Sequence, residues 1–234
     1  MLDAQAHGGV TTLTLARPER GNALAADLVE ALIAEAGAAS VDPTVHTLVL
    51  RAQGKHFCTG LDLSDLESST DGELLHRLVR IETLLAMLWH APIRTVALAQ
   101  GRTWGAGADL FAVCEQRIAA ADCTFRFPGA QFGIVLGTRR LAERLGADLA
   151  RELTVGGGEL DAAQALLHGL ATPGAEDLSP PRVDRATAAA LRSATRLDHR
   201  DADLAALVRS AAEPGLKQRI ASYRVRLLAA QIGR

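Results

Sequence analysis

Two glycine-containing loops carry the residues best suited by type and spacing to do chemistry. The first, residues 54–63 (GKHFCTGLDL), and the second, residues 101–109 (GRTWGAGAD), each follow an apolar segment typical of a buried strand. Small residues let a ligand approach the backbone, and amides at a helix start point outward with a favourable dipole. Two such loops at neighbouring strand ends can aim two amides at one oxygen, as in an oxyanion hole. Tight turns without a ligand remain the alternative, because glycine-rich turns are common.

The elements that must position these loops alternate between strand and helix. We expect strands at 10–16, 47–51 and 93–99, where β-branched and apolar residues dominate. A long amphipathic helix at 73–90 lies between the last two strands. Asn22 is the predicted N-cap of a helix between the first two, because its side chain can accept from first-turn amides. This order predicts an α/β core.

The end of the sequence differs from this core. A proline-containing stretch at 173–184 interrupts the chain, and the residues from 186 onward have a helical pattern only. We therefore divide the chain into a core of residues 1–172 and a helical segment of residues 173–234. The apolar stripe of the last helix must pack on the core or on a neighbouring subunit.

Composition excludes several classes of protein. Aromatic residues make up only 3% of the 234 residues, which argues against a stacking platform for single-stranded nucleic acid. A net charge of −2 argues against a broad phosphate-binding surface. Cys58, Cys114 and Cys123 form no CxxC pattern, and no group of residues has metal-ligand spacing. No signal peptide or membrane span is visible, so we expect a cytoplasmic protein without nucleic-acid or membrane partners.

Four segments in one order resemble the crotonase (enoyl-CoA hydratase/isomerase) superfamily, over about residues 10–170. The resemblance implies a spiral core of repeated ββα turns with a helical C-terminal appendage. It also implies homotrimers, often paired into hexamers, and a place in fatty acid metabolism. The segments are RPERGNAL at 17–24, KHFCTGLDL at 55–63, WGAGADL at 104–110 and RIAAADCTFRFPGAQFGIVLG at 117–137.

The resemblance implies a coenzyme A thioester as the substrate, with no permanently bound cofactor and no metal. The thioester oxygen would accept hydrogen bonds from the backbone amides of Leu61 and Ala106. These donors would stabilise an enolate as its charge develops. We assign a further set of residues to the substrate and coenzyme A site. They are Ala23, Leu24, Thr59, Gly60, Asp62, Leu63, Gly105, Gly107, Gly129 and Phe132.

The chain departs from the family at both acidic positions that its hydratases use. Asp109 stands at the first and is one methylene shorter than glutamate, and Gly129 stands at the second without a side chain. A carboxylate pair lets one group deliver water while the other moves the α-proton, so two-glutamate hydration is not expected. Asp109 is the predicted catalytic residue. The alternative is a helix-start aspartate that only stabilises the helix dipole.

These residues predict an acyl-CoA-binding enzyme that resembles an enoyl-CoA hydratase or isomerase and stabilises a thioester enolate. A double-bond isomerase with one carboxylate fits better than a hydratase, which is a lyase. The alternatives are a non-catalytic CoA-thioester-binding or assembly subunit, or a thioesterase or decarboxylase of the superfamily. Basic residues of the last helix are expected to form a solvated face or to contact CoA phosphates of a neighbouring subunit. They are Lys217, Arg219, Arg224 and Arg226.

Overall fold

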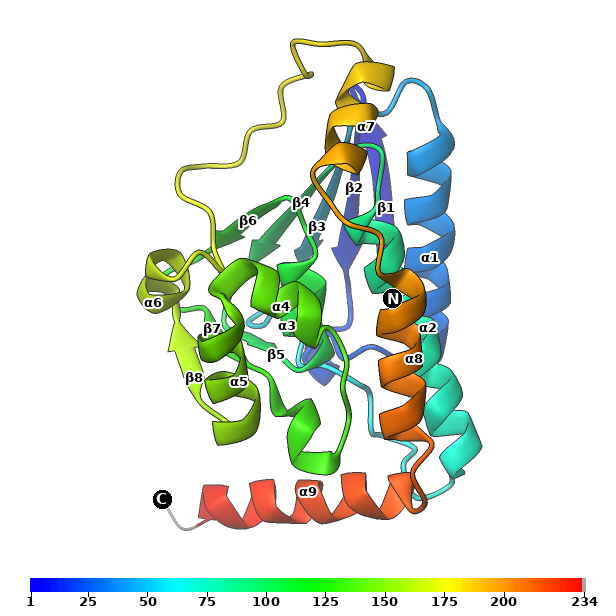
Figure 1. Cartoon of the computed structure of the whole chain (residues 1–234), viewed down its shortest axis with the longest axis vertical. Helices are drawn as coiled ribbons and strands as arrows, with labels where there is room; N and C mark the ends of the chain where they lie inside the picture. Colours follow the sequence, from blue (N-terminus) through cyan, green and yellow to red (C-terminus); the bar gives the residue numbers. More distant parts are fainter. Residues whose placement is uncertain (233–234) are drawn as a thin grey trace.

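The computed structural model describes residues 1–232, and the side chains of the last helix as far as Leu227. Its larger sheet has the strand order β1-β2-β3-β4-β6. β1 pairs antiparallel with β2, and the remaining neighbours are parallel (Figure 1). The strands are β1 (Leu2–His7), β2 (Val10–Leu15), β3 (Thr47–Ala52), β4 (Arg94–Ala99) and β6 (Gln116–Ala119).

A smaller sheet contains β5 (Arg102–Trp104), β7 (Thr124–Arg126) and β8 (Glu159–Asp161), in that order. β5 follows β4 closely in the chain, and β7 follows β6 in the same way. The chain therefore passes twice from the larger sheet to the smaller one. This repeated step produces the α/β spiral that the family resemblance implies, and the fold class is confirmed.

Helices cover the sheets, and the last elements along the described chain are all helices (Figure 1). α1 packs along α2, and α2 packs along α8. The described helices include none long and apolar enough to cross a membrane. They are α1 (Ala26–Val41), α2 (Asp71–Trp89), α3 (Ala106–Ala112), α4 (Thr138–Leu145), α5 (Ala147–Gly156), α6 (Ala162–Leu167), α7 (Arg185–Ala194), α8 (Arg200–Ala211) and α9 (Leu216–Ile232), with the 3-10 turns η1 (Pro18–Arg20) and η2 (Pro128–Phe132).

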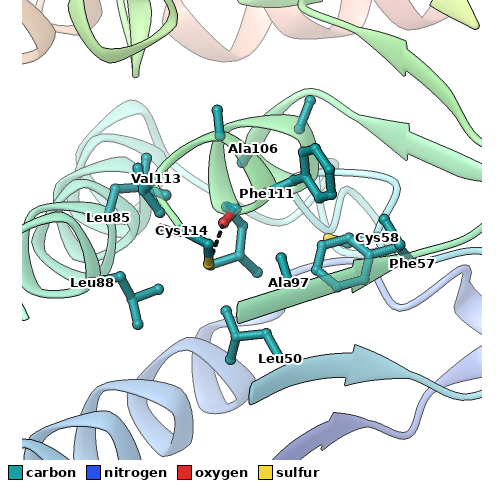
Figure 2. Close-up of a cluster of buried hydrophobic side chains, with 14 of the residues drawn as sticks. Leu50, Phe57, Cys58, Leu85, Leu88, Ala97, Ala106, Phe111, Val113 and Cys114 are labelled. Carbon is teal, nitrogen blue, oxygen red and sulfur yellow. Dashed lines mark hydrogen bonds between the residues drawn. The ribbon is translucent and has the colours of Figure 1, made fainter. Parts of the chain in front are cut away.

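The main core lies between the larger sheet and α1, α2 and α3. Every residue of α3 is buried. Figure 2 shows Leu50 of β3 and Ala97 of β4 on one side of Phe111, with Leu85 and Leu88 of α2 nearby. Small side chains such as Ala97 let the short helix approach the sheet closely, because a close-packed interior leaves few voids. The alanine-rich composition thus allows α3 to pack closely against the sheet.

Asn22 does not cap a helix, so this prediction is wrong. α1 begins at Ala26, and Asn22 has a φ of 53°. Its buried side chain accepts a hydrogen bond from the Arg17 amide (2.8 Å) and donates to the carbonyls of Gln53 (2.9 Å) and His56 (2.7 Å). The side chain is engaged because the turn at Arg17 and the first glycine loop meet at this residue. Asn22 therefore joins two segments that are far apart in sequence.

Replacing Asn22 should destabilise the fold markedly. Asn22→Ala removes three hydrogen bonds and leaves buried backbone groups without partners, so we expect a loss of about 2–4 kcal/mol of unfolding free energy. Urea denaturation measures this loss. The control is Gln5→Ala, which removes an exposed hydrogen bond to Asp3 and should cost less than about 0.5 kcal/mol. Equal effects of the two substitutions would contradict this role for Asn22.

Candidate active site

A cavity of about 380 Å³ lies between the two glycine loops, η2, α5 and α9. Its lining is largely apolar, and the charged residues found on the described lining are Asp109 and Arg151. Arg151 is exposed and pairs with Asp148, which places it at the rim. No group of three described His, Cys, Asp or Glu side chains could hold a metal ion. The predicted site residues that line the cavity are Thr59, Gly60, Leu61, Leu63, Gly105, Ala106, Asp109, Gly129 and Phe132.

The two glycine loops lie in direct contact. Cys58 and Thr103 form an isolated parallel bridge, and the Trp104 amide donates to the Cys58 carbonyl at 2.9 Å. A Cβ atom added to Gly107 would lie only 2.2 Å from that carbonyl oxygen. Gly60 has a φ of 98°, and a Cβ there would lie 3.0 Å from the Trp104 carbonyl oxygen. Both glycines are needed because the backbones approach too closely for a side chain.

The backbone amides of Leu61 and Ala106 are both available to a ligand. The amide of Leu24 donates to Gly60 (2.8 Å) and that of Asp62 donates to Leu24 (3.1 Å), a bridge that leaves the Leu61 amide without an acceptor among the described residues. Ala106 is the first residue of α3, so its amide has no acceptor within the helix. Both residues line the cavity. Two backbone donors without an acceptor among the described residues thus lie on the wall of one cavity.

Asp109 is the acidic group that faces this cavity. It lies in the first turn of α3 and is 7% exposed, and no described residue donates a hydrogen bond to its carboxyl group. Burial raises the pKa of Asp109 well above its usual value, and the negative charge of Glu82 raises it further. Arg140 acts in the opposite direction. A carboxyl group with a raised pKa holds its proton more tightly than an ordinary aspartate and is a stronger base once it is ionised.

Asp62, which was predicted to contact the ligand, lies off the described cavity lining and braces the first loop. Its carboxylate pairs with Arg17 at 2.9 Å and accepts from the Ser64 amide at 2.9 Å. Burial alone would raise the pKa of Asp62, but hydrogen bonds from Ser64 and Arg17 outweigh burial and lower it. Three other predicted residues also lie off this lining. They are Ala23, Leu24 and Gly107.

The last helix forms one wall of the cavity. The sequence left open whether this helix packs on its own core or on a neighbouring subunit. Ile220, Tyr223 and Leu227 of α9 line the cavity of their own chain. The Tyr223 ring packs against Phe132 of η2, with centroids 5.1 Å apart and an angle of 46°. The apolar stripe of this helix was visible in the sequence. Its destination was not, because a stripe does not specify which surface it covers.

Two polar contacts hold α9 in place. The Asp71 carboxylate accepts from the amides of Gly215 (3.1 Å) and Lys217 (2.8 Å) where α9 begins. Arg219 donates to the Phe132 carbonyl at 3.0 Å and to the carbonyls that end α8. The prediction that Arg219 belongs to a solvated face is therefore wrong. Its guanidinium instead donates to backbone carbonyls of η2 and of the end of α8.

The fold and the cavity define an α/β protein of the crotonase type. The model of one family, enoyl-CoA hydratase/isomerase, matches residues 5–218. The chain belongs to this family.

Individual relatives agree with this assignment. A crystal structure of a protein from Bordetella parapertussis, assigned as an enoyl-CoA hydratase/isomerase, has a TM-score of 0.90 at 43% identity and covers 95% of this chain and 97% of that one. An enoyl-CoA hydratase from Bacillus halodurans shares the fold, with a TM-score of 0.79 at 19% identity over 94% of this chain and 99% of that one.

The sequence also resembles two curated proteins. One is assigned as an enoyl-CoA hydratase of Mycobacterium leprae and is 33% identical over 169 residues, which are 70% of this chain and 66% of that protein. The other is the mitochondrial enoyl-CoA hydratase domain-containing protein 3 of Danio rerio, 29% identical over 70% of this chain and 57% of that protein. The chain thus spans less than two thirds of the length of these relatives.

The close approach of the loops predicts that two glycine-to-alanine substitutions change the stability of the fold in opposite directions. Gly107→Ala places a Cβ against the Cys58 carbonyl oxygen, so the loops must separate and we expect a loss of about 1–3 kcal/mol. Gly37→Ala in the middle of α1 meets no atom within 4 Å and should add roughly 0.5–1 kcal/mol. Chemical denaturation of both variants gives the two signs. A stabilised Gly107→Ala protein would show that the loops are not in contact.

The raised pKa of Asp109 predicts a pH-dependent gain in stability for Asp109→Asn. Because the folded-state pKa exceeds the unfolded value of about 3.9, this carboxyl group stabilises the fold most at low pH. That contribution is lost as the pH rises through the folded-state pKa. The variant should therefore unfold with a higher free energy than the wild type near pH 7, and the difference should shrink towards about pH 4. If the difference in unfolding free energy between the variant and the wild type does not change with pH, this result would contradict the raised pKa of Asp109.

Proposed function

We propose that this protein binds an enoyl thioester of coenzyme A and shifts its double bond through an enolate, with Asp109 as the base. One observation carries this proposal. A buried carboxyl group with a raised pKa faces the same cavity as the two available amides of Leu61 and Ala106. A proton acceptor beside two donors for an oxygen anion is the combination that removal of an α-proton from a thioester requires.

The reaction needs only one carboxylate. The thioester oxygen accepts hydrogen bonds from Leu61 and Ala106, and the ionised Asp109 takes a proton from C2 of a 3-enoyl thioester. The C–H electron pair moves into the conjugated system and places negative charge on the oxygen, where the two amides stabilise it. Protonated Asp109 then returns the proton at C4, and the double bond lies between C2 and C3. No atoms are gained or lost.

Hydration is less well supported because Gly129 offers no side chain. Addition of water to C3 needs a group that activates the water while another group moves the α-proton. Gly129 stands on the cavity lining where a second carboxylate would be required. The absence of a carboxylate at Gly129 also fits a non-catalytic binder of CoA thioesters. An assay of enoyl-CoA turnover and thioester binding distinguishes this binder from an isomerase.

The cavity favours an aliphatic and uncharged acyl group. Its walls are mainly apolar, and a carboxylated acyl chain would meet no buried cation to balance its charge. The coenzyme A moiety would follow the first loop from Thr59 to Leu63 and pass near Ala23 and Leu24. Trimers or hexamers through residues 173–234, outside a core of residues 1–172, and a cytoplasmic location stay predictions.

Replacing Asp109 should separate catalysis from binding. We expect Asp109→Asn to lower the isomerisation rate of 3-enoyl-CoA by about 10²–10⁴-fold, because the amide cannot accept the proton. Binding of the CoA thioester should persist, since the two backbone amides are unchanged. In the wild type, activity should fall as the pH drops through the raised pKa, because only ionised Asp109 is a base. A spectrophotometric assay of 2- and 3-enoyl-CoA measures both effects.

Asp201→Asn is the matched control, because the same chemical change then occurs at an exposed residue in the first turn of α8, away from this cavity. It should leave turnover unchanged. Tight thioester binding without turnover of any enoyl-CoA would support the non-catalytic binder instead. Turnover that survives Asp109→Asn would remove Asp109 from the mechanism.

A further inference from the structure

A buried group of charges lies behind the cavity, outside the residues that the proposed reaction uses. Glu82 of α2 is 2% exposed and Arg140 of α4 is 1% exposed. Their side chains form a two-pronged pair, with Nη2 to Oε1 at 2.5 Å and Nη1 to Oε2 at 3.0 Å. Asp203 of α8 approaches the same guanidinium at 3.1 Å and also pairs with Arg139 at 2.7 Å. Three helices that are distant in sequence thus meet in one charged cluster.

This cluster is adjacent to Asp109. The Asp109 carboxylate lies against the first turn of α4, so closely that a Cβ on Gly137 would be 2.2 Å from its Oδ1. Arg140 follows Gly137 by three residues and therefore lies on the same face of α4, one turn further on. Glu82 lies on α2. Both α2 and α4 pack against α3, the helix that carries Asp109. Glu82 and Arg140 are the charged groups that act on Asp109 from these neighbouring helices.

Stability alone gives a poor account of the pair. Removing two charges from water is costly, and replacing such a pair with apolar side chains is often neutral or stabilising. The Nε of Arg140 is also buried without a hydrogen-bond partner among the described residues. A buried donor of this kind in a native protein calls for an explanation, and a role at a functional site is one.

We infer that Glu82 and Arg140 are positioning residues for Asp109, whose fixed charges set how readily that carboxyl group releases its proton. The inference rests on the proposed function, in which Asp109 alternates between its two protonation states. Glu82 opposes ionisation of Asp109 and Arg140 favours it, while Asp203 neutralises part of the Arg140 charge. Once an acyl group fills the cavity, water cannot supply this balance, so fixed charges must do so.

Glu82→Gln tests the inference with little change in shape. The substitution removes the charge that opposes ionisation and leaves Arg140 less neutralised, so both effects make Asp109 a stronger acid. We expect the acid limb of the turnover profile to move down by about one pH unit. The control is Glu115→Gln, which removes the carboxylate that pairs with Arg192 at 2.6 Å and should not move this limb.

A direct titration separates this inference from the proposed function. The Asp109 carboxyl carbon can be followed by NMR in protein labelled with ¹³C-aspartate, with its signal assigned from its absence in Asp109→Asn. A titration midpoint that is lower in Glu82→Gln than in the wild type is the expected result, and an unchanged midpoint overturns the inference. A lowered midpoint in a protein without enoyl-CoA turnover supports the inference and overturns only the proposed function. If Glu82→Gln fails to fold, Asp203→Asn should lower the midpoint in the same direction.

Discussion

The contact between the two glycine loops is the constraint on which the rest of the site depends. Leu61 and Ala106 belong to different loops, and both line one cavity because the loops lie in contact, with Gly107 against the Cys58 carbonyl. The larger sheet brings the loops together, since β3 and β4 are parallel neighbours and each loop follows one of them. The spiral connection into the smaller sheet then fixes the distance between the two backbones.

The other end of α3 is held by two arginines, of which Arg117 is buried and Arg144 is partly buried. Arg144 donates to the carbonyls of Ala112 and Cys114 at 3.0 Å each, and Arg117 donates to Cys114 at 2.8 Å. Burial lowers the pKa of Arg117 to about 9 and that of Arg144 to about 10, which reflects how fully these groups are removed from water. Positive charge at a helix C-terminus is favourable. With this end held, the first turn of α3, which carries Ala106 and Asp109, has little freedom to move.

The sequence predicted what local patterns determine. Segments dominated by β-branched and apolar residues predicted β2, β3 and β4. β5 and β8 have three residues each, too few for a period to show, and β1 is an exposed edge strand without an apolar face. The role of Asn22 and the position of α9 depend on segments far away in the chain. The candidate site divides in the same way: glycine spacing predicted the loops, whereas the charges behind Asp109 emerge only when three helices assemble.

The wall that α9 contributes has a consequence for how this protein can diverge. Ile220 and Tyr223 shape the cavity from a helix that shares no backbone with the two glycine loops or with α3. Substitutions in α9 can therefore change the shape of the cavity while leaving Asp109 and the two glycine loops where they are. The shape of the cavity and the position of Asp109 can therefore change under separate selection, because they depend on different parts of the chain.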